Sequence, residues 1–282
     1  MTNNNIQFST NNRDVIKPQE IDIFIPEHNI AIEFNGLYWH NEKSGKDKWY
    51  HYNKTKKCAE KGIRLIHIFE DEWLNNQESC MDLLGRFLGL PCTKIFARKC
   101  RIEEIRVGEA RKFLEDNHLQ GYSAASVTLG LFFEDKLLQL MSFKHSRYNK
   151  NIEWENIRHC NLRGHQIVGG TQKLWSYFIK TYNPTSVVSY SDNRWFEGST
   201  YEKLGFSLQK DNPPQYFYTD LKKRWHRSLF TKKRCIKKAM EIDSELIEEE
   251  LMKMTENYIA IEILELGKIW DVGQKTWVWT KK

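Results

Sequence analysis

Residues 20–40 read EIDIFIPEHNIAIEFNGLYWH, and this stretch decides the fold of the first part of the chain. Two runs rich in isoleucine and phenylalanine flank PEHN, a pattern that predicts a β-hairpin with a four-residue loop. Counting outward from the loop pairs Ile25 with Ile30 and Asp22 with Glu33. Because side chains alternate across a strand, the isoleucines share one face of the hairpin and the carboxylates share the other.

The polar face of the hairpin is the first candidate site. Carboxylates that face each other across a ladder lie about 4.5–5.5 Å apart at Cβ and repel unless a cation neutralises them. Since Mg²⁺ prefers carboxylate oxygens, Asp22 and Glu33 are candidate metal ligands, whereas the alternative is a wet face on which both acids are solvated. The predicted polar face contains Glu20, Asp22, Glu33 and Asn35, and the predicted core face contains Ile21, Ile23, Ile25, Ile30, Ile32 and Phe34.

A histidine follows the hairpin directly. His40 ends the run NGLYWH, one turn beyond the second strand, within reach of the acidic face. A histidine near its ordinary pKa can take a proton from a water or give one to a leaving oxygen. A histidine after a strand is usually structural, but its position beside opposed acids favours a catalytic role.

The composition indicates a globular protein with ample core. The 282 residues are 40% hydrophobic and 13% aromatic, which is enough for two domains. The six cysteines show no metal-binding spacing, which indicates free thiols without a disulfide-linked partner, and no apolar run is long enough to span a membrane. These features predict a soluble cytoplasmic protein, in the host cytoplasm if a phage encodes it, and leave the oligomeric state open.

Three segments are expected along the chain. Residues 1–92 begin with a polar tail and read strand, strand, helix, strand, helix; residues 93–220 alternate helices and strands with a hairpin around Glu134 and Asp135. Residues 221–282 are basic, then acidic and helical, and end in an expected small hairpin. The predicted fold class is therefore mixed α/β (α+β) with a basic helical C-terminal segment.

The charge is concentrated in the third segment. Nine of the seventeen residues from Lys222 to Lys238 are Lys or Arg, and the acidic run EIDSELIEEE follows. Basic clusters with interleaved aromatics favour nucleic acid, because phosphate contacts release condensed counterions. A solvated helix face is the alternative.

The hairpin resembles a known nuclease core. Asp22 followed by Glu33-Phe34-Asn35 resembles the PD-(D/E)xK pattern, and IEFNGLYWH with KGIRLIHIFEDEW is similar to its very-short-patch-repair branch, including phage homing endonucleases of the EDxHD type. The resemblance spans about residues 13–75. It implies a restriction-endonuclease-like domain that uses Mg²⁺ or Mn²⁺ to cleave double-stranded DNA.

The resemblance also assigns roles. Asp22 and Glu33 would hold the metal, Asn35 occupies the position of the motif's lysine, and His40 would be the general base or acid. Lys54 would restore the positive charge missing at Asn35, with an ordinary solvated lysine as the equal alternative. Glu20 and Glu70 are further candidate acids. The candidate DNA contacts are Trp39, His51, Arg224, Arg227, Lys232, Lys233 and Arg234.

The middle segment is similar to the GNAT acetyltransferase fold, through LGLFFEDKLLQLMSF, VGGTQKLW and STYEKLGF. That family binds the pyrophosphate of acetyl-CoA with Q/R-x-x-G-x-G/A at a helix N-terminus. QIVGGT supplies Gln166, Gly169 and Gly170, but has Thr171 at the last position. Candidate phosphate contacts in this segment are Arg158, His159, Arg163 and Arg194.

Three functions are therefore in competition. The first is a Mg²⁺-dependent homing endonuclease whose GNAT-like domain and basic segment hold the duplex. The alternatives are a CoA-dependent N-acetyltransferase with a vestigial nuclease domain, and a DNA-binding protein without catalysis.

Overall fold

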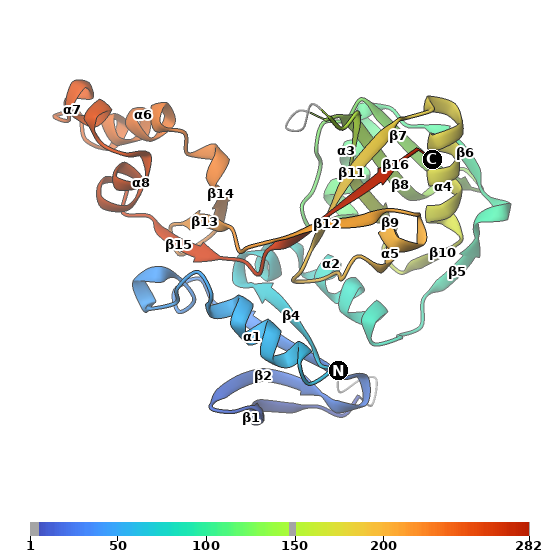
Figure 1. Cartoon of the computed structure of the whole chain (residues 1–282), viewed down its shortest axis with the longest axis horizontal. Helices are drawn as coiled ribbons and strands as arrows, with labels where there is room; N and C mark the ends of the chain where they lie inside the picture. Colours follow the sequence, from blue (N-terminus) through green and yellow to red (C-terminus); the bar gives the residue numbers. More distant parts are fainter. Residues whose placement is uncertain (1–5, 147–150, 282) are drawn as a thin grey trace. The chain divides into compact units, whose positions relative to one another are not determined.

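The computed structural model describes residues 6–146 and 151–281 (Figure 1). The chain is mixed α/β and forms two compact units, one of residues 1–75 and 213–273, the other of residues 76–212 and 274–282. The boundaries expected from the sequence lie after residues 92 and 220 instead. The compact units differ from that division because each is built from two separate stretches of chain, an arrangement that local patterns do not reveal.

The first unit is built on a four-stranded sheet with the order β1-β2-β3-β4. Strands β1 to β3 are antiparallel, and β3 is parallel to β4 because helix α1 makes the crossover between them. The elements are β1 (Ser9–Ile16), β2 (Gln19–Ile25), β3 (Ile30–Asn35), α1 (Tyr50–Ala59) and β4 (Arg64–Phe69), with short 3₁₀ turns at Pro26–His28 and Glu42–Ser44.

The predicted hairpin forms with the predicted register near its loop. Ile25 pairs with Ile30, Phe24 with Ala31 and Ile23 with Ile32, and the ladder ends there. The opposition of Asp22 to Glu33 therefore lies one pair beyond the last backbone pairing. Phe34, expected in the core, is 42% exposed.

The polar N-terminal stretch is a strand and not the expected tail. Strand β1 pairs with β2 through Ser9–Phe24, Thr10–Ile23 and Asn12–Ile21. Its residues are mostly polar because they form the edge of the sheet, where only part of each side chain is covered.

A smaller sheet and a helical cluster complete the first unit (Figure 1). The sheet has the order β14-β13-β15. The buried residues Tyr218, Phe230 and Ile236 belong to one core that joins this sheet to the helices. The elements are β13 (Tyr216–Thr219), β14 (Arg224–His226), a 3₁₀ turn (Arg227–Leu229), α6 (Lys232–Ile242), α7 (Glu248–Lys253), α8 (Glu256–Tyr258), a π-helical turn η6 (Ile259–Ile263) and β15 (Gly267–Trp270).

The second unit has a seven-stranded sheet with the order β12-β16-β11-β9-β8-β7-β6. All neighbouring strands are antiparallel except β9 and β11, which are parallel. The expected hairpin turn is present, and Glu134 and Asp135 both have positive φ values, as a tight type I′-like turn requires. The strands of this sheet are β6 (Arg101–Glu104), β7 (Val127–Phe133), β8 (Lys136–His145), β9 (Trp154–Asn161), β11 (Ser186–Asp192), β12 (Ser207–Asn212) and β16 (Gln274–Thr280). A separate parallel pair is formed by β5 (Thr93–Phe96) and β10 (His165–Val168).

Helices cover both faces of this sheet. Leu174, Trp175 and Phe178 of α4 pack with one set of strand residues, whereas Phe113 and Leu114 of α3 pack with another. The strand order with α4 as the crossover between parallel β9 and β11 agrees with the α/β expectation for this segment. The helices are α2 (Glu70–Phe87, kinked at Asn76), a 3₁₀ turn η4 (Ala97–Lys99), α3 (Val107–Asn117), α4 (Gly170–Tyr182) and α5 (Ser199–Lys203).

The expected hairpin at the end of the chain is wrong. Strand β15 pairs with β13 in the first unit, whereas β16 inserts between β11 and β12 in the second. Asp271 turns the chain between them by accepting the backbone N–H groups of Gln215 and Gly273 at 2.7 and 2.8 Å. Two alternating runs that look like one hairpin thus serve two different sheets.

All six cysteines are free, as the sequence indicated. Among residues 6–146 and 151–281, no helix combines the length and the apolar character needed to cross a membrane.

Candidate functional site

The two acids of the hairpin are both bound to other parts of the first unit. Asp22 accepts the backbone N–H of Phe34 at 2.7 Å through Oδ2, which continues the contact between β2 and β3 beyond the ladder. Glu33 lies beneath α1, where its carboxylate pairs with the ammonium group of Lys54. Within the described residues, one oxygen of each carboxylate is thus engaged by a protein donor, whereas Glu33 Oε2 is buried without a hydrogen-bond partner.

The Glu33–Lys54 pair is fully enclosed. The side chains are 3% and 4% exposed. Burial raises the pKa of Glu33 to about 7, and the neighbouring Lys54 opposes that rise. Lys54 is thus a buried counter-ion and not the solvated helix lysine that the sequence left open.

Two histidines form a hydrogen-bonded chain beside this pair. His51 Nδ1 donates to the carbonyl of Trp270 at 2.7 Å, because a carbonyl can only accept. His51 Nε2 must then accept, and His40 Nδ1 donates to it at 2.9 Å. Burial lowers the pKa of His40 to about 4 and that of His51 to about 3, so both rings are neutral near pH 7.

Asn35 is also an interior group. Thr55 donates through Oγ1 to the carbonyl of His51 and contacts His67 Nε2 at 2.8 Å, so His67 Nε2 is the donor there. His67 Nδ1 can then accept from the Asn35 side-chain amide, at 3.2 Å. The position taken by the motif's lysine therefore holds a buried structural amide.

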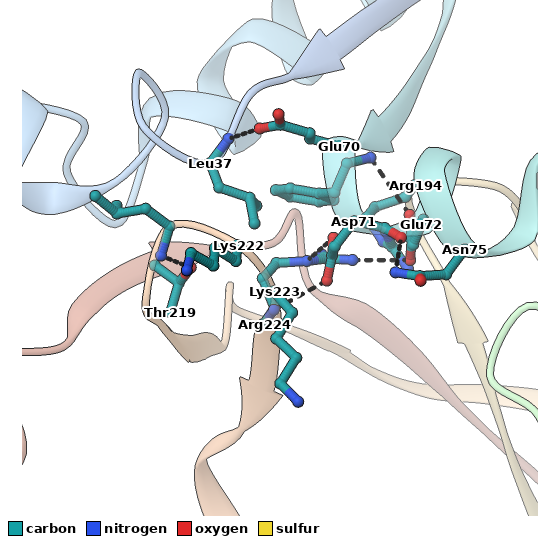
Figure 2. Close-up of polar contacts among 12 residues, drawn as sticks. Leu37, Glu70, Asp71, Glu72, Asn75, Arg194, Thr219, Lys222, Lys223 and Arg224 are labelled. Carbon is teal, nitrogen blue, oxygen red and sulfur yellow. Dashed lines mark hydrogen bonds and ion pairs between the residues drawn. The ribbon is translucent and has the colours of Figure 1, made fainter.

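The two further acids have other partners as well. Glu20 pairs with Arg13 at 2.8 Å. Glu70 accepts the backbone N–H of Leu37 at 2.9 Å (Figure 2). Within the described residues no group of three or more His, Cys, Asp or Glu side chains is arranged to hold a metal ion.

The aromatic residues at the hairpin's end point to solvent. Trp39 is 69% exposed and Tyr38 56% exposed. Their rings contact each other edge to face at 4.7 Å. Trp39 is therefore accessible to a partner and does not pack in the interior of this unit.

Arg224 is a structural residue, contrary to its predicted role in DNA binding. Figure 2 shows it beside the first turn of α2, where it bonds to Asp71 at 2.8 Å and Glu72 at 3.1 Å. Its guanidinium group lies 3.8 Å from the centre of the Phe69 ring. Because its side chain is only 6% exposed, Arg224 cannot reach a phosphate. His51, the other interior member of the predicted DNA contacts, is equally inaccessible.

The other basic candidates differ in accessibility. Lys232 donates to the carbonyl of Met252 and holds α6 to α7. Arg227, Lys233 and Arg234 are exposed. The exposed face of α6 therefore keeps two of the three cations that the sequence assigned to it.

The glycine turn before α4 is the main polar feature of the second unit. Gly169 is the N-cap with φ +78°, no side chain caps the helix, and the first intrahelical bond runs from the Lys173 N–H to the Gly169 carbonyl. The N–H groups of the first turn therefore face outward. Gln166 and Gly169 are exposed, so the partial motif lies at the surface.

A buried polar network underlies that turn. Gln139 Nε2 lies 2.9 Å from His159 Nε2 and 3.2 Å from Thr171 Oγ1, and Thr171 Oγ1 lies 3.0 Å from His159 Nε2. Burial lowers the pKa of His159 to about 4, which keeps the ring neutral. A Cβ on Gly170 would overlap the Gln139 amide, so only glycine fits there.

Basic groups flank the same turn. Lys173 donates to the carbonyls of Ala97 and Cys100 and fixes the η4 turn against the first turn of α4. Arg98 and Lys99 of η4 are exposed. Cations and helix amides thus meet at one surface, a combination suited to an anion.

Strands β9 and β11 separate beside this turn. They pair only through Trp154–Val187 and Glu155–Val188, although β9 continues to Asn161. Beyond these pairs, Ser189 contacts the backbone carbonyl of Asn156 at 3.0 Å through its side chain. His159 of β9 contacts Thr171 in the first turn of α4. The start of α4 therefore lies beside the part of β9 that no longer pairs with β11.

One tyrosine faces this divergence and was assigned no role from the sequence. Ser189 donates to the Tyr201 hydroxyl at 2.8 Å. Burial raises the pKa of Tyr201, so the phenol keeps its proton at neutral pH. The run YEKLGF marked the position, and the single Gln139 within LLQLMSF was a comparable signal of a polar group in an apolar strand.

The proposed phosphate contacts of this segment are engaged elsewhere. Arg158 donates to the carbonyl of Gly121 at 3.0 Å, Arg163 pairs with Glu78 and Arg194 pairs with Asp192. His159 belongs to the interior network. These four residues stabilise turns and strand ends.

No protein-family model matches the chain, and no curated protein matches it in sequence. Among solved structures, the chain is similar to an aminoglycoside 6′-acetyltransferase type Ii (13% identity, TM-score 0.31, covering 40% of this chain and 86% of that one). It is also similar to the spermidine/spermine N-acetyltransferase SpeG of Vibrio cholerae (13% identity, TM-score 0.32, covering 41% of this chain and 82% of that one). A third similar structure is a Bacillus subtilis acetyltransferase in complex with CoA (14% identity, TM-score 0.36, covering 65% of this chain and 100% of that one).

The prediction of a Mg²⁺- or Mn²⁺-dependent endonuclease is contradicted by these findings. Asp22 and Glu33 are bound to protein donors, and no metal-holding group occurs among the described residues. The catalytic roles predicted for Asn35 and Lys54 rested on a metal site that this geometry does not form.

Proposed function

We propose that the second unit binds a coenzyme A thioester and transfers its acetyl group to an amine. The observation that carries this proposal is the position of the α4 glycine turn at the divergence of β9 and β11. In open α/β sheets, ligands bind where neighbouring strands separate at their carboxyl ends. Outward-facing amides at that point favour a pyrophosphate.

The residues present fit the coenzyme. The first turn of α4 offers amides, and Arg98 and Lys99 add positive charge beside it. Thr171 replaces the small last residue of the motif, but its hydroxyl turns inward to His159. The outer surface of the turn is thus free of that hydroxyl, and the exposed Gly169 allows close approach of an anion.

Tyr201 supplies the proton that such a transfer needs. When bound, the coenzyme would provide the activated acetyl group. Burial raises the pKa of Tyr201 and keeps the proton on its hydroxyl, whereas the hydrogen bond with Ser189 acts in the opposite direction and lowers that pKa. The phenol would serve as a general acid for the thiolate that leaves when the acetyl group is transferred.

Acetyl-CoA is expected to stabilise the protein against thermal unfolding. At a ligand concentration 100 times Kd the gain is about 2.7 kcal/mol, which is a rise of roughly 5–11 °C in the melting temperature. Arg98→Glu/Lys99→Glu should weaken binding about tenfold or more, since it reverses two charges beside the turn. Lys112→Glu, an exposed change on α3, is the control. Wild-type protein without any shift at millimolar acetyl-CoA would remove the proposal.

Binding of double-stranded DNA by the first unit is a second candidate, favoured by the exposed cations of α6. Lys233→Ala/Arg234→Ala should lower the slope of log Kd against log salt by about 1.8, because each phosphate contact contributes about 0.9. Lys56→Ala/Lys61→Ala removes two exposed charges, one from α1 and one from the turn that follows it, and serves as the comparison. Fluorescence anisotropy with a labelled duplex measures both. Equal slopes in the two variants would exclude α6 from the interface.

A further inference from the structure

The network under the α4 turn contains a residue that departs from the motif. Thr171 stands where Q/R-x-x-G-x-G/A has Gly or Ala, yet its hydroxyl makes two of the three contacts in the network. Gln139 is 1% exposed, and its Oε1 has no hydrogen-bond partner among the described residues. A polar group this deeply buried is costly unless its position is used.

The contacts are mutually restrictive. His159 is neutral and can accept at Nε2, and the Gln139 amide reaches both Nε2 and the Thr171 hydroxyl. The same amide fills the space beside the α carbon of Gly170. Each member therefore limits the rotation of the others, and Thr171 transmits this restriction to the backbone of the first turn.

We infer that Thr171, with Gln139 and His159 behind it, is a positioning residue that fixes the amides of the α4 turn for the pyrophosphate of the coenzyme. This inference rests on the proposed function. A preorganised set of donors binds an anion without the cost of ordering the loop. The hydroxyl does so from the interior and needs no contact with the ligand.

Thr171→Ala distinguishes a positioning role of the Thr171 hydroxyl from a simple requirement for a small residue at the last position of the motif. The change restores the consensus residue, so a role for small size alone predicts unchanged or tighter binding. The inference predicts the opposite: a Kd for coenzyme A about tenfold weaker, because one hydrogen bond of about 1–1.5 kcal/mol no longer holds the turn. Thr171→Ser keeps the hydroxyl and should restore most of the affinity.

The measurements are calorimetric titration with coenzyme A and steady-state acetylation of a polyamine. In Thr171→Ala, KM for acetyl-CoA should rise about tenfold while kcat stays within twofold, a division that general loosening of the fold would not produce. Ser176→Ala on the same helix is the control. Wild-type protein that does not bind coenzyme A overturns the proposed function and this inference together. Wild-type binding with equal affinity in Thr171→Ala overturns only the inference.

Discussion

Lys54→Met is expected to lower the free energy of unfolding by about 3–5 kcal/mol at pH 8. The change leaves the carboxylate of Glu33 in the interior without its counter-ion, and a buried charge without a partner is far more costly than a missing pair. Methionine fills a volume similar to the lysine stem, so packing changes little. Urea denaturation followed by circular dichroism measures the loss.

The loss should depend on pH in a defined direction. The pKa of Glu33 is raised from 4.5 in the unfolded reference to about 7 in the folded protein. The raised pKa stabilises the folded state below pH 4.5, and this stabilisation is lost as the pH rises through 7. Without Lys54 the pKa of Glu33 should rise further, because the lysine lowers it in the wild type. The variant should therefore be nearly as stable as wild type at pH 5.5 and much less stable at pH 8.

Two further variants make the Lys54 experiment decisive. Lys56→Met removes an exposed lysine from the same helix and should change stability by less than about 0.5 kcal/mol. Glu33→Gln/Lys54→Met removes both charges and should recover most of the loss. A Lys54→Met loss that is the same at pH 5.5 and pH 8 would show that packing and not charge is responsible.

Arg224→Met is expected to cost a similar amount, about 3–5 kcal/mol. It withdraws one cation from Asp71 and Glu72 and also removes the contact with the Phe69 ring. Arg224→Lys should recover only part of the loss, because a lysine cannot reach two carboxylates with a planar fork. Thermal unfolding at low and high salt measures the effect.

The matched control for Arg224 is Arg227→Met. Arg227 belongs to the same basic run but is exposed, with its guanidinium group 5.5 Å from the centre of the Tyr216 ring. It should be nearly neutral. If Arg227→Met were as damaging as Arg224→Met, the ion pairs with Asp71 and Glu72 would not explain the cost.

Local patterns predicted two hairpins correctly, whereas the third, expected at the end of the chain, is wrong. The pairing of Ile25 with Ile30 and the tight turn at Glu134 and Asp135 follow from alternation and turn chemistry, which act over a few residues. The helix that begins at Gly170 was likewise marked by its two glycines. These features depend on neighbours in sequence.

The candidate site in the first unit was misjudged because its partners are distant in sequence. Glu33 and Lys54 are 21 positions apart, and His51 bonds to Trp270, 219 positions away. The sequence shows that Asp22 and Glu33 share a face but not that α1 covers that face. Whether an acid binds a metal or a lysine is decided by which helix lies over it.

The basic run was misjudged for the same reason. Its residues look alike in sequence, yet Arg224 is interior while Lys233 is exposed. Charge density predicts the total attraction of a surface for phosphates, but only the residues that reach solvent contribute to it. In the second unit, the polar Gln139 within an apolar strand carried information that charge counting ignores.

Strand β16 lies between β11 and β12 and comes from residues 274–280, whereas its two neighbours are made much earlier. During translation, β11 and β12 therefore leave the ribosome before β16, the strand that lies between them, has been made. Folding of the first unit is delayed in the same way, because β13, β14 and β15 are synthesised only after all of residues 76–212. Both units must then complete their folding nearly together and after synthesis, so a premature stop shortly before residue 274 would leave β11 and β12 as unpaired edges prone to aggregation.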